Sequence, residues 1–216
     1  MFDTPITQDG NVISGPLRAP KQMLEEQSYD GSGAGSIHDD SMAEKLGFKA
    51  GPIEGPTHFS LFDPLLVKIW GKDWFEKGCF SSHFKNMVVE GEETKAFVEL
   101  PSDENQTHLR CWAEKADGTQ VLEASATLGG GKTLLEERLE NLRPLDHFII
   151  LEDMHVGMKG AVDEMETMGP DQHMGKLYPF SLKQKLAAIT ENSPAYSDDA
   201  ASPWGRAIIP TEMMSV

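Results

Sequence analysis

The residues of this chain that could do acid–base chemistry are concentrated between positions 38 and 58. His38 carries an imidazole, which exchanges a proton near neutral pH, and Glu54 carries a carboxylate that could act beside it. Gly55 is expected to open a helix, where a backbone N–H favours negative charge developing on a ligand oxygen. Together these groups could transfer a proton to or from a ligand while holding one of its oxygens.

Each of these polar side chains also has a structural interpretation, and the alternatives stay open. His38 could simply cap or pack against the short helix that follows it, and Asp40 is more simply a helix cap than a catalytic group. Glu54 could be a solvated carboxylate in a turn. His58 and its neighbour Thr57 could contact a ligand, although a packed, hydrogen-bonded histidine is the simpler interpretation of His58.

The elements that must position these groups can be predicted from the pattern of apolar residues. Asp39, Asp40 and Ser41 supply the side chains of a helix start, and Gly47 supplies its end. After a turn segment over residues 50–56, Thr57 to Trp70 is apolar on nearly every side, which is typical of a buried helix. Pro64 should kink this helix, or mark a restart with Asp63 as its cap.

The period of the pattern changes after this helix. Strands are expected near residues 79–84, 94–100, 107–114 and 120–128, and Gly129–Gly130–Gly131 ends this unit. One buried helix followed by a meander of strands predicts an α+β fold in which a curved antiparallel sheet buries one face on the helix.

Less regular structure is expected elsewhere. The first 20 residues hold three prolines and few apolar residues, which predicts an irregular arm. A short helix over 21–27 is expected to follow it. Towards the C-terminus the sequence predicts a helical, charged segment over 132–143, a strand over 147–151 and a helix over 182–190.

The charge balance excludes several classes of partner. The formal net charge is −16, which argues against nucleic acid and against an anionic membrane surface. No apolar run is long enough for a transmembrane helix and no signal peptide is visible at the N-terminus, so a cytoplasmic protein is expected.

No metal site and no cofactor are expected from the sequence. Cys79 and Cys111 have no CxxC spacing and are predicted to be buried free thiols in strands. The remaining histidines show no ligand spacing; they are His83, His108, His147, His155 and His173.

A segment near the C-terminus echoes the one around His38. His38, Asp40, Ala43 and Gly47 match Tyr196, Asp198, Ala201 and Gly205 at a common offset of 158 residues. Ile53-Glu-Gly-Pro56-Thr57 is then echoed by Ile208-Ile-Pro210-Thr211 with a deletion. Duplication explains this better than chance, but the second copy stops before any strands equivalent to 79–128.

Residues 38–55 resemble the MaoC-like hydratase and dehydratase family, which has the hot-dog fold. The family's catalytic histidine falls on His38, but its catalytic aspartate falls on Gly33 and the usual histidine of its turn is Glu54. The second copy keeps Asn192 and Pro194 of the motif, with Glu191 near the aspartate position and Tyr196 in place of the histidine. Tyrosine there resembles the non-catalytic copies of double hot-dog dehydratases.

The resemblance implies a hydratase or dehydratase that acts on enoyl or 3-hydroxyacyl thioesters of coenzyme A or acyl carrier protein. His38 and Glu54 would be catalytic, and Gly55, Thr57, His58 and Asp40 would bind substrate. Because the family aspartate is missing, a non-catalytic subunit that binds an acyl ligand or completes a partner's fold is the second hypothesis. An acyl thioesterase that uses Glu54 is the third.

The resemblance and the echo together predict the domain organisation. We expect a hot-dog domain over residues 1–131, a linker over 132–146 and a partial second hot-dog unit over 147–216. Half a unit cannot bury its own apolar side chains, so it should pack on the first unit or on another chain. A homodimer or a higher oligomer is expected, because hot-dog units usually pair edge to edge.

Overall fold

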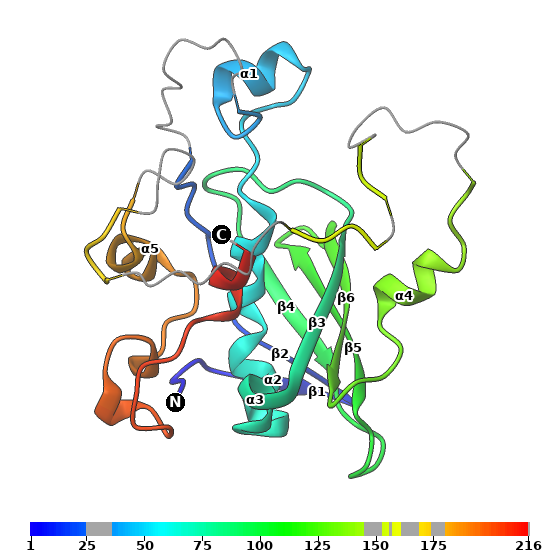
Figure 1. Ribbon diagram of the computed structural model, residues 1–216, viewed down its shortest axis with the longest axis vertical. Helices are drawn as coiled ribbons and strands as arrows, with labels where there is room; N and C mark the ends of the chain where they lie inside the picture. The colour runs from blue at the N-terminus through cyan, green and yellow to red at the C-terminus, as the bar shows by residue number, and fades with distance from the viewer. Residues whose placement is uncertain (25–35, 145–152, 156, 161–168, 174–179, 216) are drawn as a thin grey trace.

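A six-stranded antiparallel sheet curves around one central helical segment (Figure 1). The computed structural model describes residues 1–24, 36–144, 153–155, 157–160, 169–173 and 180–215. The strands lie in the order β1-β2-β4-β5-β6-β3. Their bounds are β1 Thr7–Asp9, β2 Val12–Ser14, β3 Gly78–Phe84, β4 Thr94–Glu99, β5 His108–Lys115 and β6 Gln120–Leu128. This arrangement is a hot-dog fold, so the predicted α+β class and fold are confirmed.

The central segment combines two kinds of helix. It begins as the 3₁₀ helix η1 (Gly55–Leu61) and restarts as the α-helix α2 (Asp63–Trp70) with Pro64 in its first turn. A proline has no N–H to donate, and a first turn needs none, which explains why the restart falls there. The predicted single helix over 57–70 is therefore two helices, broken at the place where the sequence allowed a restart.

The core lies between this segment and the inner face of the sheet. Buried and exposed side chains alternate along β4 and β5, as expected for strands with one face on a core. The fully or nearly buried apolar side chains form one cluster: Ile13, Ile53, Leu61, Phe62, Leu65, Leu66, Trp74, Val88, Ala96, Val98, Leu109, Cys111, Ala113, Val121, Leu122, Ala124 and Ala126.

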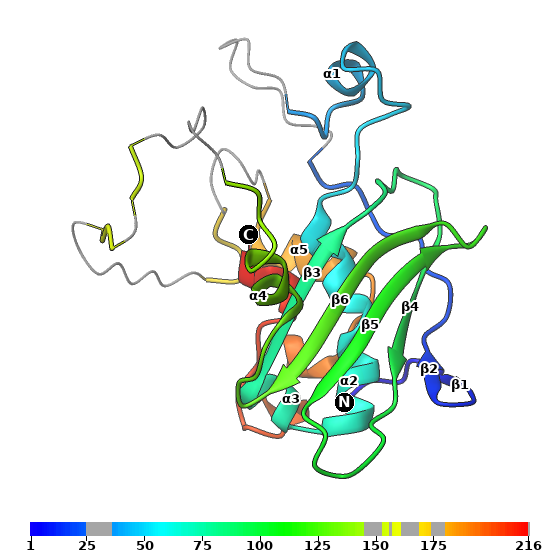
Figure 2. The same cartoon turned by 90° about the vertical axis from the view of Figure 1, so that its right-hand side faces the viewer.

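The remaining helices lie around this core. α1 (Asp40–Lys45) precedes the central segment and α3 (Asp73–Lys77) follows it, while α4 (Leu134–Leu139) lies beside β3. Figure 2 shows the outer face of the sheet, with α2 and α5 (Leu182–Ala188) behind it and α4 in front. The short 3₁₀ helices η2 (Pro194–Tyr196), η3 (Asp199–Ala201) and η4 (Thr211–Ser215) complete the C-terminal part.

Three predictions about local structure were wrong. The expected irregular N-terminal arm contains the hairpin β1–β2, which turns at Gly10 (φ 57°) and adds to the sheet through β2 and β4. Residues 21–24 are not helical, and the rest of that predicted helix lies outside the described residues. Cys111 is buried as expected, but Cys79 is exposed, because β3 is an edge strand there.

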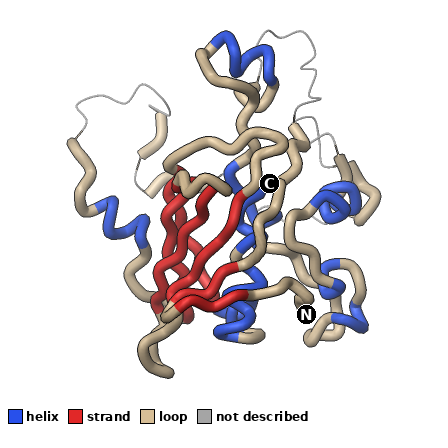
Figure 3. The backbone as a smooth tube through the Cα atoms, turned by 180° about the vertical axis from the view of Figure 1, so that it is seen from behind, coloured by secondary structure: helices blue, strands red, loops and turns tan. Residues whose placement is uncertain are grey.

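The C-terminal part packs on the helix side of the same sheet. Phe180, Ile189, Ala195 and Tyr196 are buried, and η4 contacts η1. Seen from behind in Figure 3, the loops of this part run beside the central helical segment. The predicted helix over 182–190 is confirmed as α5, whereas the strand predicted over 147–151 lies outside the described residues.

The central helix should carry much of the stability of the fold. We expect Leu65→Ala to lower the free energy of unfolding by roughly 2–5 kcal/mol, because Leu65 is fully buried and truncation leaves a cavity. Leu139→Ala is the matched control: that leucine, also helical, is 54% exposed and should change stability by less than about 0.5 kcal/mol. Urea denaturation of both variants makes the comparison, and similar losses would contradict the central position of α2.

Candidate functional site

A groove of about 470 Å³ lies where the chain enters the central helix. Its walls come from the segment before η1 and from the end of β3 with the loop after it. The lining is mostly apolar and consists of Ile37, His38, Pro52, Ile53, Glu54, Gly55, Pro56, His58, Phe84, Lys85, Asn86, Met87 and Val88. The structure thus brings together four of the six predicted site residues, which are His38, Glu54, Gly55 and His58.

The other two predicted residues do not line the groove. Thr57 is buried in η1 and is not part of the lining. Asp40 accepts a hydrogen bond of 2.7 Å from the backbone N–H of Gly51, while Asp39 caps α1 by accepting from the N–H of Met42. Asp40 therefore holds the loop that carries the groove wall. The predicted helix cap is not Asp40 but its neighbour Asp39.

His38 is held in one tautomer by its surroundings. Its Nδ1 lies 2.6 Å from the carbonyl oxygen of Pro52, which also accepts a 2.7 Å hydrogen bond from Gln22. A carbonyl oxygen can only accept, so Nδ1 carries the proton and the lone pair of the neutral ring is on Nε2. The ring is half-buried and has no carboxylate partner among the described residues. The family's aspartate position, Gly33, lies outside those residues.

Two glycines allow the close packing around His38 and the helix start. A Cβ on Gly51 would lie 2.2 Å from the carbonyl oxygen of His38, so no larger residue fits without moving the backbone. A Cβ on Gly55 would lie 2.6 Å from the ring of Phe84, which covers this end of the helix. Within the described part of the chain the N–H of Gly55 has no hydrogen-bond partner, and the first bond of η1 is donated by Thr57 to the carbonyl of Glu54.

His58 lies at the bottom of the groove in an unusual state. The side chain is only 2% exposed, and no described group forms a hydrogen bond with its Nδ1. Burial lowers the pKa of His58 to about 4, and the positive charge of Lys115 acts in the same direction. His58 is therefore a neutral imidazole at physiological pH.

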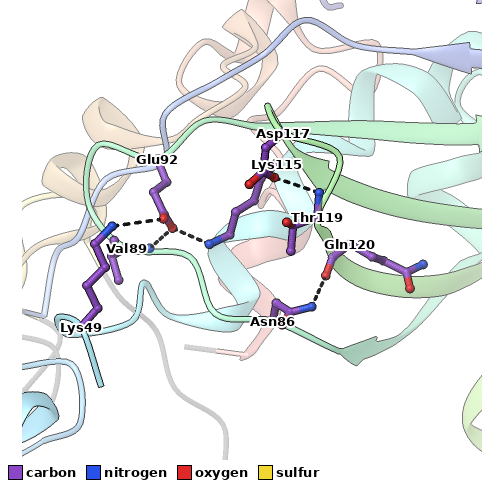
Figure 4. A network of polar contacts seen from close by, with 8 residues as sticks. All are labelled: Lys49, Asn86, Val89, Glu92, Lys115, Asp117, Thr119 and Gln120. Atoms are coloured by element: carbon purple, nitrogen blue, oxygen red, sulfur yellow. Dashed lines mark hydrogen bonds and ion pairs between the residues drawn. The ribbon is translucent and has the colours of Figure 1, made fainter. Parts of the chain in front are cut away.

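A polar network braces the loop that forms the outer wall of the groove (Figure 4). Glu92 accepts hydrogen bonds from the ammonium of Lys115 at 2.7 Å and from the N–H of Val89 at 3.0 Å, and Lys49 approaches it at 3.7 Å. Partial burial raises the pKa of Glu92, but these donors outweigh it and the pKa is lowered. The loop after β3 is thus held by a charged carboxylate.

A second polar centre, which the sequence analysis missed, lies at the other end of η1. Asp63, in the first turn of α2, is completely buried. Its carboxylate accepts hydrogen bonds from Trp74 Nε1 at 2.9 Å, from Tyr196 Oη at 3.1 Å and from the hydroxyl of Thr211 at 2.5 Å. The backbone N–H of Thr211 also donates to this carboxylate, at 3.3 Å. An acidic residue within an otherwise apolar helix was the only sequence signal of this centre.

Beside it lies a buried ion pair between Lys185 of α5 and Glu212 of η4, separated by 3.5 Å. Burial raises the pKa of Glu212 to about 7 despite the attraction of Lys185. Burial likewise raises the pKa of Asp63 to about 6, although the hydrogen bonds from Thr211, Trp74 and Tyr196 oppose the shift. Tyr196, which echoes His38, is therefore a structural residue that joins the C-terminal part to α2.

The two echoing segments share local chemistry as well as sequence. In each, the first residue of an Asp-Asp pair caps a short helix: Asp39 accepts from Met42 and Asp198 accepts from Ala200. The second residue accepts from an N–H further along, which is Gly51 for Asp40 and Ala207 for Asp199. Gly47 and Gly205 both have positive φ, at 85° and 67°. By these roles Asp39 and Asp40 correspond to Asp198 and Asp199, one residue away from the match that the sequence suggested, whereas the two glycines keep that match.

The described ranges contain neither a metal-binding cluster nor a membrane-spanning helix. No cluster of three or more histidine, cysteine, aspartate or glutamate side chains there has the arrangement to hold a metal ion. No described helix combines the length and the apolar character that crossing a lipid bilayer requires.

The fold and the groove define this chain as a hot-dog protein with a ligand-sized groove at the start of its central helix. Its sequence matches no family model, and no curated protein matches it significantly. Similar solved structures include an (R)-hydratase of A. caviae involved in PHA biosynthesis, which is 20% identical with a TM-score of 0.41, over 56% of this chain and 97% of that one. R-hydratase PhaJ1 of Pseudomonas aeruginosa is 16% identical with a TM-score of 0.42, over 58% and 83%.

The buried carboxyl of Asp63 predicts a pH dependence of stability. Its folded pKa, about 6, lies above the usual value of 3.8, so the folded state binds this proton more tightly than the unfolded state. The resulting stability is complete below pH 3.8 and is lost as the pH rises through 6. Between pH 5 and pH 7.5 we expect the melting temperature of the wild type to fall more steeply than that of Asp63→Asn.

The largest loss of stability from ionising Asp63 is roughly 3 kcal/mol, because each unit by which the folded and unfolded pKa values differ is worth about 1.36 kcal/mol. Glu212 titrates in the same direction but is present in both proteins, so the comparison isolates Asp63. Asp73→Asn, on the surface of α3, is the control that should keep the wild-type slope. Parallel pH profiles for wild type and Asp63→Asn, measured by differential scanning calorimetry, would contradict the titration of Asp63.

Proposed function

We propose that this chain is a MaoC-like hot-dog protein that binds an acyl thioester in the groove and acts on it as a hydratase or dehydratase. The observation that carries the proposal is the pairing of two groups in one apolar groove. These are His38, whose Nε2 holds the lone pair, and the backbone N–H of Gly55, which no group in the described ranges pairs. A mostly apolar lining suits an acyl chain, and a few polar groups at one end suit its reactive part.

The chemistry would use these groups in the following way. The N–H of Gly55 donates to the thioester carbonyl oxygen, where negative charge develops as water adds to the double bond. Nε2 of His38 takes a proton from the attacking water, whose oxygen bonds to the β-carbon. The protonated imidazole then returns a proton to the α-carbon. Pro52 keeps Nδ1 protonated throughout and thereby fixes the ring.

Glu54 is the proposed second carboxylate of the groove. It lines the groove beside Gly55 and is half-buried. It could support His38 as the acid that the family aspartate would otherwise supply. Catalysis of thioester hydrolysis would need Glu54 to face the thioester carbon, and this thioesterase alternative rests on that one residue.

The principal alternative is a hot-dog subunit that binds an acyl ligand without turnover. The absence of a carboxylate partner for His38 in the described part of the chain favours this alternative. Both hypotheses place the ligand in the same groove and differ only in whether water is added.

For the domain organisation we propose a hot-dog unit over 1–131, a linker over 132–146 and a partial second unit over 147–216. The shared roles of the two Asp-Asp pairs support a duplication. The contact between η1 and η4 supports it too, because η1 contains Pro56 and Thr57 of the echo and η4 begins at Thr211, directly after Pro210.

The hydratase proposal predicts a weak activity that depends on His38. We expect purified protein to hydrate crotonyl-coenzyme A or a longer enoyl-coenzyme A slowly, and His38→Ala to reduce the rate at least about 100-fold, the usual contribution of a general base. His108→Ala is the matched control, because His108 is exposed at the start of β5, away from the groove. Equal rates for wild type and His38→Ala would remove His38 from the mechanism.

We also propose that the chain forms at least a homodimer. Within the described residues β3 pairs only with β6, so its outer edge keeps backbone groups that another strand could pair. Light scattering at micromolar concentration should give at least twice the mass of 23.8 kDa. A folded monomer with the segment 180–215 resistant to protease would contradict this assembly. It would show that the C-terminal part buries its apolar side chains within one chain.

A further inference from the structure

Gln22 lies in the N-terminal arm, outside the lining of the groove, yet it is hydrogen-bonded to both segments that form the walls. Its side-chain amide donates to the carbonyl oxygen of Pro52 at 2.7 Å and lies 3.5 Å from that of His38. Its backbone N–H donates to the carboxylate of Glu90, in the loop after β3, at 2.5 Å. One arm residue therefore joins the segment before η1 to the loop that forms the other wall.

The orientation of the Gln22 amide follows from its three partners. Its Oε1 accepts a hydrogen bond of 3.1 Å from the backbone N–H of Leu24. A backbone N–H can only donate and a carbonyl oxygen can only accept, so Nε2 is the atom that faces Pro52 and His38. The reversed amide would set its oxygen against two carbonyl oxygens and its NH₂ group against an N–H.

The arm is anchored on either side of Gln22. Before it, the backbone of Arg18 exchanges hydrogen bonds of 2.8 and 2.7 Å with Thr94, and the Arg18 guanidinium pairs with the buried Glu191 at 2.7 Å. After it, the side chain of Leu24 is buried. Because a glutamine side chain has many rotamers, a backbone that is already fixed lowers the entropy cost of holding its amide in one place.

We infer that Gln22 is a positioning residue for His38: its amide fixes the carbonyl of Pro52, and this carbonyl fixes the imidazole. The inference rests on the proposed function where it concerns catalysis, because His38 is the acid–base group of that proposal. It goes further in giving the N-terminal arm a role in the site.

The carbonyl of Pro52 takes the place that a carboxylate often has beside an acid–base histidine. It lies 2.6 Å from Nδ1 of His38 and so leaves Nε2 to the ligand. A backbone carbonyl in a turn moves with its peptide plane, so the orientation of the ring depends on what holds that plane. The amide of Gln22 is the donor that holds it. Without this donor we expect the chain to fold and the imidazole to lose its fixed orientation.

The first measurement follows the Nδ1 proton of His38 by NMR and needs no ligand. A ring N–H gives a separate proton signal only while a hydrogen bond protects it from exchange with water, and His38→Ala identifies the signal. Gln22→Met keeps the length of the side chain and removes the amide, so the proton should exchange at least about tenfold faster. Gln8→Met is the matched control, because the amide of Gln8, an exposed glutamine of the arm, donates to the carbonyl of Gly10 at 3.0 Å.

The second measurement is the rate at which crotonyl-coenzyme A is hydrated. Gln22→Met should lower kcat about 10- to 100-fold and change KM less than about threefold, since a misplaced acid–base group slows the reaction while the lining stays intact. Gln22 is half-buried, so the fold should tolerate this change, and Gln22→Leu repeats both measurements in a second side chain. A change in KM alone would make Gln22 a brace of the wall and overturn its role toward His38.

The outcomes separate this inference from the proposed function. A wild type without a protected Nδ1 proton, or an exchange rate unchanged in the folded Gln22 variants, would overturn the inference and leave the hydratase proposal standing. If the wild type hydrates no enoyl thioester while Gln22→Met still speeds the exchange of this proton, the proposed function fails and the positioning of His38 by Gln22 stands.

Discussion

The burial of one carboxylate, that of Asp63, constrains more of this structure than any other interaction. A charge taken out of water needs hydrogen bonds from every side, and three segments supply them: α3 through Trp74, η2 through Tyr196 and η4 through Thr211. The central helix, which is otherwise apolar, therefore requires the C-terminal part of the chain in one position. The buried pair of Lys185 and Glu212 fixes α5 against η4 in the same region.

This arrangement gives the two ends of the central helical segment different roles. The restart at Asp63 is sealed by the C-terminal part, whereas the start at Gly55 borders a groove whose walls are held by Asp40 and by Glu92 with Lys115. At the first end, the carboxylate of Asp63 accepts hydrogen bonds from Trp74, Tyr196 and Thr211. At the second, the N–H of Gly55 and Nδ1 of His58 lack partners within the described residues. Buried side-chain oxygens of Thr94, Thr127, Thr190 and Glu212 also lack a hydrogen-bond partner in the described part of the chain, so the feature particular to His58 is its place in the groove lining.

The two echoing segments contain the same kinds of local hydrogen bonds but contribute to different parts of the structure. Both use an Asp-Asp pair to cap a short helix and to close the following loop onto a backbone N–H. His38 comes just before the first pair and lines the groove, whereas Tyr196 comes just before the second pair and donates a hydrogen bond to Asp63. The same backbone device thus holds an acid–base side chain at one end of the helix and a structural hydrogen-bond donor at the other.

The sequence by itself determined the buried helix, the four main strands and the neighbourhood of His38, Glu54 and Gly55, because these depend on local patterns. An apolar stretch on all sides, a period of two and a glycine-proline turn each have one low-energy solution. It did not determine the β1–β2 hairpin, whose three-residue strands are too short for a pattern and which joins the sheet through the pairing of β2 with β4. Only the tertiary structure decided that His58 is buried with no partner at Nδ1 in the described part of the chain, and that Asp63 holds the C-terminal part. Both depend on contacts with residues distant in sequence, and burial and hydrogen bonding across such distances leave no local pattern.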